Sequence, residues 1–231
     1  MSTPQSLSGI SSMATRTLLA ELARAWEQRS GVAVAFESVG GVDAAKRVQA
    51  GEAFDVVVLA ADAIGKLAEA GRVLAGSVVD LVHSGVAVAV RDGAPRPDLS
   101  DEAAVRRAVL AAKSIGYSTG PSGTALLKLF ERWGIAAQLE GRLVQARAGV
   151  PVGSLVAGGE VELGFQQLSE LIHVQGITIV GPLPPAIQID TVFSAAICAT
   201  SAQPEAARAL LAFMASPDTA DAKRRQGMDA A

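Results

Sequence analysis

Four short segments of small or polar residues each stand just before a predicted helix, at residues 9–12, 38–41, 118–123 and 148–153. The first N–H groups of a helix have no partner within it and carry a partial positive charge. Small residues let an anion approach these donors closely, so we predict an anion site at the four loops. Its predicted ligand-binding residues are Ser11, Ser12, Gly40, Gly41, Ser122, Gly123, Val152 and Gly153. Ordinary helix capping is the alternative explanation for any one loop, whereas four loops, two in each expected lobe, favour a shared site.

The signatures of several catalytic classes are missing from the sequence. It has no Walker-type phosphate loop and no G-x-S-x-G elbow, and the glycine pair at 40–41 is too short for a dinucleotide fingerprint. His83 and His173 stand far apart, and the single cysteine, Cys198, lies in an apolar run typical of core packing. We therefore expect no metal and no cofactor.

Charge and leader patterns limit the partners and the location. The formal net charge is −3 and no basic stripe is present, which argues against a nucleic-acid partner. Residues 1–7 lack the basic start and apolar run of a secretory signal, and no segment approaches the roughly 20 apolar residues of a membrane span. The chain as written is expected to be cytoplasmic, or periplasmic if a leader has been removed.

Alternating predicted helices and strands position the four loops. Periodicity and turn residues predict helices over 14–29, 42–50, 62–70, 101–113, 124–133, 153–157, 204–215 and 219–226. Strands are predicted over 32–36, 55–60, 78–90, 114–118, 143–146, 163–167, 178–183 and 191–199. Strand–helix alternation of this kind is typical of an α/β fold with parallel strands.

Two breaks divide this α/β chain. Prolines and glycine interrupt it at 92–97, and a proline pair interrupts it again at 184–185. We predict a discontinuous lobe 1 over 1–88 plus 190–231 and a lobe 2 over 89–189. Two chain crossings between lobes form a hinge, which would allow the lobes to close on a ligand.

Three segments resemble a known family. Residues 41–60, 158–167 and 181–188 are similar to those of the periplasmic molybdate-binding proteins of ABC transporters and their type 2 solute-binding relatives. The resemblance implies two lobes with the ligand in the cleft between them, held by loop serines, backbone N–H groups and a late tyrosine. Carried over, a loop serine falls on Ser11 or Ser12, and backbone donors fall near Ser122 and Val152. The resemblance also implies an ABC transporter permease as a partner if the chain is exported.

Two departures from the family pattern point to a different ligand. Gly41 stands where the resemblance implies a second serine, and Gln167, a further predicted ligand-binding residue, stands where it implies the tyrosine. Loss of two hydroxyl donors argues for a larger anion with carboxylate groups rather than molybdate. The nearby cations that could pair with such carboxylates are Arg16, Lys46, Arg47 and Arg147.

The chain also resembles aconitate isomerase, an enzyme built on the same fold. Isomerising an unsaturated tricarboxylate requires a general base next to a carboxylate, and Glu170 and Asp43 are the candidates. The first hypothesis is a solute-binding protein for a small oxyanion or carboxylate. The alternative is a cytoplasmic isomerase of a polycarboxylate, and a cytoplasmic anion sensor remains a third option.

Overall fold

The computed structural model describes residues 6–231, and the chain divides into two compact units. Unit 1 comprises Met1–His83 and Val192–Ala231, and unit 2 comprises Ser84–Thr191. Within the described part of the chain, no helix is long and apolar enough to cross a bilayer.

The chain passes between the units inside strands rather than in loops. The passages lie at 83/84, within β4 (Val79–Arg91), and at 191/192, near the start of β9 (Asp190–Ile197), whereas the sequence suggested 88/89 and 189/190. The segment 92–97, expected as a crossing, belongs to unit 2 in this division. Proline and glycine interrupt a strand there, but they do not mark the end of a packed unit.

Unit 1 is built on a mixed sheet with the strand order β2-β1-β3-β9-β4. Besides β4 and β9, its strands are β1 (Ser6–Ser12), β2 (Ala33–Val39), β3 (Val56–Ala60) and the short β10 (Asp229–Ala230), which pairs with β4. Strand β1 runs parallel to both β2 and β3, whereas β9 is antiparallel to β3.

Strand β1 corrects the sequence-based interpretation, which treated residues 9–12 as a loop. The strand lies between β2 and β3, and every residue from Gly9 to Ser12 is at least partly buried. Glycine and serine have low strand propensity and break the apolar pattern of this segment, so only its pairing with two neighbours reveals it. Asp55 fixes the beginning of β1, because its carboxylate accepts from the N–H of Ser8 at 2.9 Å.

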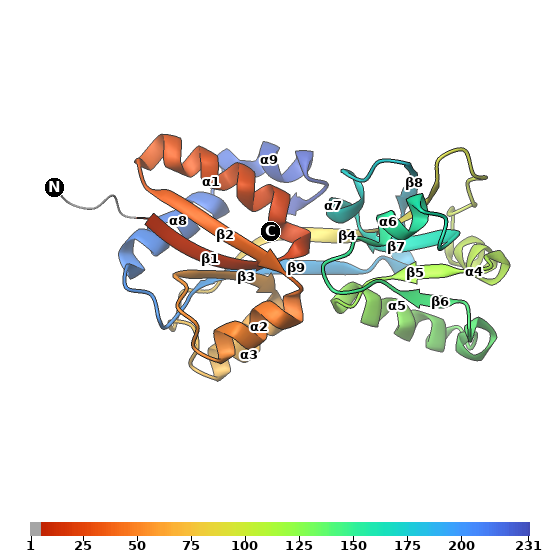
Figure 1. Cartoon of the computed structure of the whole chain (residues 1–231), viewed down its shortest axis with the longest axis horizontal. Helices are drawn as coiled ribbons and strands as arrows, with labels where there is room; N and C mark the ends of the chain where they lie inside the picture. The colour runs from red at the N-terminus through yellow and green to blue at the C-terminus, as the bar shows by residue number, and fades with distance from the viewer. Residues whose placement is uncertain (1–5) are drawn as a thin grey trace. The chain divides into compact units, whose positions relative to one another are not determined.

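Helices cover both faces of this sheet, with α1 (Arg16–Ser30), α8 (Pro204–Ala215) and α9 (Ala220–Arg225) on one face and α2 (Gly41–Gln49) and α3 (Ala61–Glu69) on the other (Figure 1). Short 3-10 turns, η1 (Met13–Thr15) and η4 (Pro217–Thr219), precede α1 and α9. The alternation of β3 explains the two layers: Val56 and Val58 pack with α1 and α8, and Val57 and Leu59 pack with α2 and α3.

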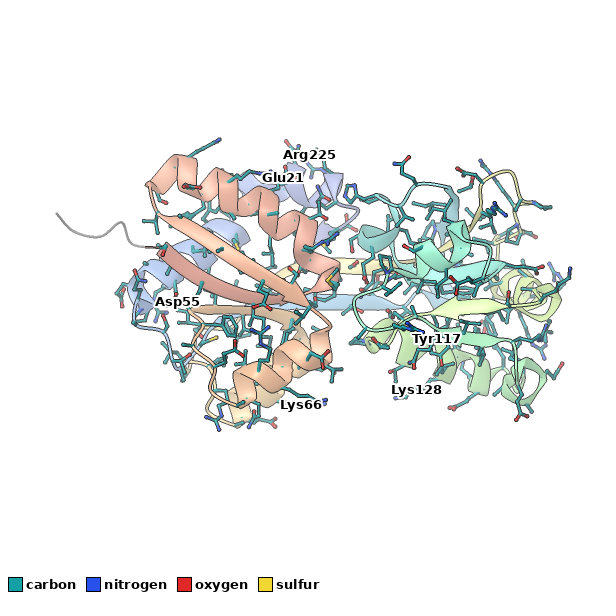
Figure 2. All side chains as sticks on the ribbon, viewed as in Figure 1. Glu21, Asp55, Lys66, Tyr117, Lys128 and Arg225 are labelled. Atoms are coloured by element: carbon teal, nitrogen blue, oxygen red, sulfur yellow. The ribbon has the colours of Figure 1, made fainter. Side chains whose placement is uncertain are left out.

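An ion pair holds the last helix of unit 1 against the first. Figure 2 shows Arg225 of α9 beside Glu21 of α1, and the guanidinium donates to the carboxylate. Burial alone would raise the pKa of Glu21, but hydrogen bonds from Arg225 and Gln226 outweigh burial and lower this pKa. The C-terminal segment is thereby attached to α1, the helix that follows β1 and η1.

Unit 2 has its own sheet, with the order β4-β7-β5-β6 and with β8 also paired to β4. The strands are β7 (Leu163–Gln167), β5 (Ile115–Tyr117), β6 (Leu143–Gln145) and β8 (Ile177–Pro182). The helices are α4 (Glu102–Ala111), α5 (Pro121–Arg132), α6 (Val152–Ala157) and α7 (Leu168–Leu171), with 3-10 turns η2 (Ala136–Leu139) and η3 (Pro185–Ile187). Val86 and Val88 of β4 pack on α4 and α5, whereas Ala87 and Ala89 pack on α7.

Two helix starts differ from the sequence prediction. Helix α4 begins at Glu102 rather than at the predicted residue 101, because Asp101 caps it: the Asp101 side chain accepts from the N–H of Ala104 at 2.7 Å. Helix α5 begins at Pro121, three residues before the predicted start at 124, since proline is favoured at the first helical position. This earlier start places Ser122 and Gly123 in the first turn of α5.

Candidate functional site

The two adjacent serines at the end of β1 have different surroundings. Ser11 is fully buried, its Oγ lies 2.8 Å from the Oγ of Ser38 on β2, and it also donates to the carbonyl of Ser12 at 3.2 Å. Its hydroxyl is therefore committed to holding β1 and β2 together. The sequence indicated Ser38 only as a member of the predicted loop at 38–41 and gave no signal for its hydrogen bond to Ser11.

Ser12 is the serine whose hydroxyl is available. Its side chain is 7% exposed, and its Oγ has no hydrogen-bond partner among residues 6–231. Ser12 precedes η1 without capping it, so local structure does not explain the residue. A buried hydroxyl without a partner costs about 1–3 kcal/mol, which a ligand acceptor atom would recover.

The N-terminus of α2 lies beside Ser12. A β-carbon built on Gly41 would stand 3.6 Å from the β-carbon of Ser12. Gly40 precedes the helix, and the first helical hydrogen bond runs from the N–H of Ala44 to the carbonyl of Gly40. The N–H groups of the first turn thus precede the helical ladder and face the end at which Ser12 lies. Ser12, Gly40 and Gly41 form the unit 1 donor group.

In unit 2, the loop before α5 is packed tightly around a glycine. The Oγ atoms of Ser118 and Ser122 lie 3.1 Å apart, so the hydroxyl of Ser122 has a partner, whereas the sequence predicted a backbone donor near this residue. A β-carbon on Gly123 would come within 1.9 Å of the Ser118 carbonyl oxygen. Gly123 is therefore required for this loop to fold against the helix, whatever else the loop does.

Gln166 accepts a hydrogen bond from the predicted backbone donor at Val152. The N–H of Val152, first residue of α6, donates to the Oε1 of Gln166 at 2.7 Å. The Nε2 of Gln166 donates in turn to the Oε2 of Glu170 at 2.8 Å. The N–H of Val152 is thus occupied within unit 2, and its role as a ligand donor stays a prediction. Gly153 lets α6 pack closely, because a β-carbon there would lie 3.1 Å from the side chains of Val174 and Ile177.

Two buried donors lie at the end of β7. Gln167 is 3% exposed and ends the strand, and Ser169 is 6% exposed in α7. The Nε2 of Gln167 and the Oγ of Ser169 both lack hydrogen-bond partners in the part of the chain that the structure describes. The sequence suggested Gln167, but it gave no signal for Ser169. Gln167 and Ser169 form the unit 2 donor group.

The two candidate bases differ in environment. Asp43 is exposed in the first turn of α2, where a carboxylate is stabilised by the helix dipole. Glu170 is half-buried, and its Oε2 is held by Gln166. The structure thus provides an oriented carboxylate at Glu170 and a solvated one at Asp43.

The four cations suggested for carboxylate binding fall into two groups: one is already paired with carboxylates, and three are exposed. Arg47 bonds to Glu37 and Glu52, and these hydrogen bonds lower the pKa of both carboxylates, so Arg47 is already engaged. Arg16, Lys46 and Arg147 are exposed and form no ion pair within residues 6–231. The same described range contains no group of three or more His, Cys, Asp or Glu side chains that could hold a metal ion.

The sequence was compared with known families and proteins. Residues 7–229 match the family of bacterial extracellular solute-binding proteins. The chain belongs to this family. The solute-binding chain is also 40% identical over 216 residues to an aconitate isomerase of a Pseudomonas species, a match covering 90% of this chain and 81% of the relative.

Solved structures show the fold of this solute-binding protein. The periplasmic molybdate-binding protein of Azotobacter vinelandii superposes with a TM-score of 0.81 at 22% identity, covering 96% of this chain and 98% of that one. The substrate-binding domain of a molybdenum ABC transporter from Clostridium difficile superposes with a TM-score of 0.76 at 14% identity, covering 97% and 98%. The predicted α/β fold of the type 2 periplasmic-binding-protein class is confirmed.

Proposed function

We propose that this solute-binding protein binds a small anion bearing carboxylate groups, and that the unit 1 donor group and the unit 2 donor group each offer hydrogen-bond donors to such an anion. The observation that carries the proposal is that the Oγ of Ser12, the Nε2 of Gln167 and the Oγ of Ser169 are among the buried side-chain atoms that lack hydrogen-bond partners within residues 6–231. Buried polar groups are nearly always hydrogen-bonded in folded proteins, so these three unpaired atoms, two of them on the sequence-predicted residues Ser12 and Gln167, support a missing acceptor.

The chemistry of these donors favours an oxygen-rich acceptor. Hydroxyls, a carboxamide NH₂ and helix N–H groups all donate to oxygen, and a carboxylate accepts several such bonds. A carboxamide at position 167 offers two N–H donors on a planar group, which suits a planar carboxylate. Arg16, Lys46 and Arg147, exposed and without ion pairs among residues 6–231, are available for further carboxylates on a larger ligand.

A thermal-shift panel tests the proposal. Molybdate, tungstate, sulfate, phosphate, citrate and the two aconitates are each added to the purified chain. A bound ligand stabilises the fold by about 2.7 kcal/mol at a hundredfold excess over Kd, so the polycarboxylates are expected to raise the melting temperature most. Absence of a shift with every anion would overturn the proposal, and a larger shift with molybdate would overturn the carboxylate preference.

We further propose, as the alternative function, that the protein isomerises an unsaturated polycarboxylate. The oriented carboxylate of Glu170 favours this reading, and so does the 40% identity to a relative named aconitate isomerase. Glu170 would take a proton from the methylene carbon next to one carboxylate, and the electron pair would spread over the allylic system. Return of the proton to the other end of that system moves the double bond, and no oxidant or reductant is consumed.

Interconversion of cis- and trans-aconitate, followed by absorbance with the pure protein, tests the second proposal. Wild-type protein is expected to bring both isomers to the same final mixture, and boiled protein is the control. No interconversion from either isomer would overturn the isomerase proposal while leaving the binding proposal to the thermal-shift panel. Export and docking to a transporter permease stay predictions.

A further inference from the structure

Gln166 is a polar side chain that bonds directly to the proposed base. It lies on β7, is 2% exposed, and uses both ends of its carboxamide. Its Oε1 accepts from the N–H of Val152 at 2.7 Å, and its Nε2 donates to the Oε2 of Glu170 at 2.8 Å. One side chain therefore joins β7, the start of α6 and the helix that carries Glu170.

The orientation of this carboxamide is determined by chemistry. A backbone N–H can only donate, so the carboxamide atom facing Val152 must be the oxygen. The NH₂ group must then face Glu170, and it can only donate. The carboxylate of Glu170 consequently receives a hydrogen bond whose direction is set by the backbone of α6.

This arrangement acts on Glu170 in two ways. A donor that faces a carboxylate stabilises its ionised form, which is the form that accepts a proton. A fixed donor also holds the carboxylate in one rotamer, which matters because misplacing a reacting group by about 1 Å can cost 10²-fold in rate. Gln166 itself gains and loses no proton.

We infer that Gln166 is a positioning residue for the general base Glu170. The inference rests on the proposed isomerase activity. Gln166 acts through Glu170, so its loss slows proton transfer far more than it weakens ligand binding. A structural role alone would be expected to change stability and binding but to leave the turnover of folded, saturated protein nearly unchanged.

Gln166→Glu is the sharpest variant. It keeps an oxygen that can accept from the N–H of Val152, and it replaces only the NH₂ that faces Glu170. The turnover of cis-aconitate is expected to fall about 10²-fold, within the range for impaired general base catalysis, with KM changed less than about 3-fold. Ser114→Ala is the matched control, since it removes a side-chain acceptor of the Glu162 N–H in the same unit and leaves Gln166 untouched.

A double-variant cycle shows whether Gln166 acts through Glu170. Glu170→Gln is combined with Gln166→Met, and thermal unfolding verifies that each variant is folded. The double variant is expected to be no slower than Glu170→Gln alone, because the effects of residues that act as a unit are not additive.

The inference is overturned if Gln166→Glu keeps wild-type turnover, or if the losses of turnover in the two single variants multiply in the double variant. If the wild-type protein shows no turnover, the isomerase proposal itself is overturned. If the wild-type protein and Gln166→Glu are equally active, only the inference about Gln166 is overturned.

Discussion

A β-carbon added to Gly41 would stand 3.6 Å from the β-carbon of Ser12, so the start of α2 and the end of β1 share one small space in unit 1. The distance is an ordinary van der Waals contact, so a small side chain fits there. A serine at position 41 would place a second hydroxyl beside the unpaired hydroxyl of Ser12.

Gly41→Ser is therefore expected to change ligand preference without loss of stability. Replacing a glycine at a compatible position raises the free energy of unfolding by about 0.4–1 kcal/mol. The added hydroxyl should increase the thermal shift given by molybdate and tungstate relative to that given by citrate. Gly41→Ala is the control, because it adds the β-carbon without the donor, and an equal effect of both variants would contradict the expectation.

Ser12→Ala and Ser11→Ala are expected to have opposite effects. The Oγ of Ser12 has no hydrogen-bond partner among the described residues, so its removal should raise the free energy of unfolding of the ligand-free chain by up to about 1–3 kcal/mol and weaken anion binding up to about tenfold. Ser11 bonds to Ser38, so its removal should lower the free energy of unfolding by about 0.5–1.5 kcal/mol. Chemical denaturation and calorimetric titration measure the two quantities. Loss of stability in Ser12→Ala would show that its hydroxyl has a structural role.

Gly123→Ala should disrupt the loop before α5. Its β-carbon would lie 1.9 Å from the carbonyl oxygen of Ser118, a backbone atom that cannot move without moving the loop. We expect a loss of several kcal/mol, of the size seen for severe overpacking. Gly120→Ala is a matched control in the same loop, because its nearest contact is the Ser118 Oγ at 3.8 Å. Similar melting temperatures for the two variants would contradict the steric argument.

Cys198 should be inert in the folded protein. Burial, with a smaller contribution from the charge of Asp55, raises the pKa of its thiol to about 12. Because the folded pKa lies above that of an unfolded thiol, about 8.5, ionisation favours the unfolded state. The contribution to stability is complete below that value and is lost as the pH rises toward 12. A thiol-reactive chromophore at pH 8 should label only unfolded protein, and rapid labelling of the native chain would contradict this.

Glu170→Gln and Asp43→Asn separate the two candidate bases. If the isomerase proposal holds, Glu170→Gln should lower turnover about 10²–10⁴-fold, because an amide accepts no proton. Asp43→Asn should change turnover less than about 2-fold, since Asp43 is exposed in a first helical turn. Steady-state rates with cis-aconitate measure both, and a reversed order would assign the base to Asp43.

Much of the architecture follows from local sequence patterns. Strand β7 and helix α8 have the bounds that periodicity predicted, 163–167 and 204–215, because apolar spacing and proline mark them clearly. Gly31 ends α1 in the left-handed region, a conformation that glycine adopts readily after a helix. The sequence by itself also located the small and polar residues at the starts of α2, α5 and α6, since their presence there is a local property, whereas residues 9–12 form strand β1 rather than a loop.

The tertiary structure decided what those loops can do. Strand β1 is recognisable only from its two neighbours, because its serines and glycine hide the apolar pattern. The hydroxyl of Ser11 and the N–H of Val152 are occupied, and the partners that occupy them, Ser38 and Gln166, lie 27 and 14 residues away along the chain. A hydrogen bond to a distant residue leaves no local trace, so sequence patterns locate donors but only the folded chain shows which remain unpaired.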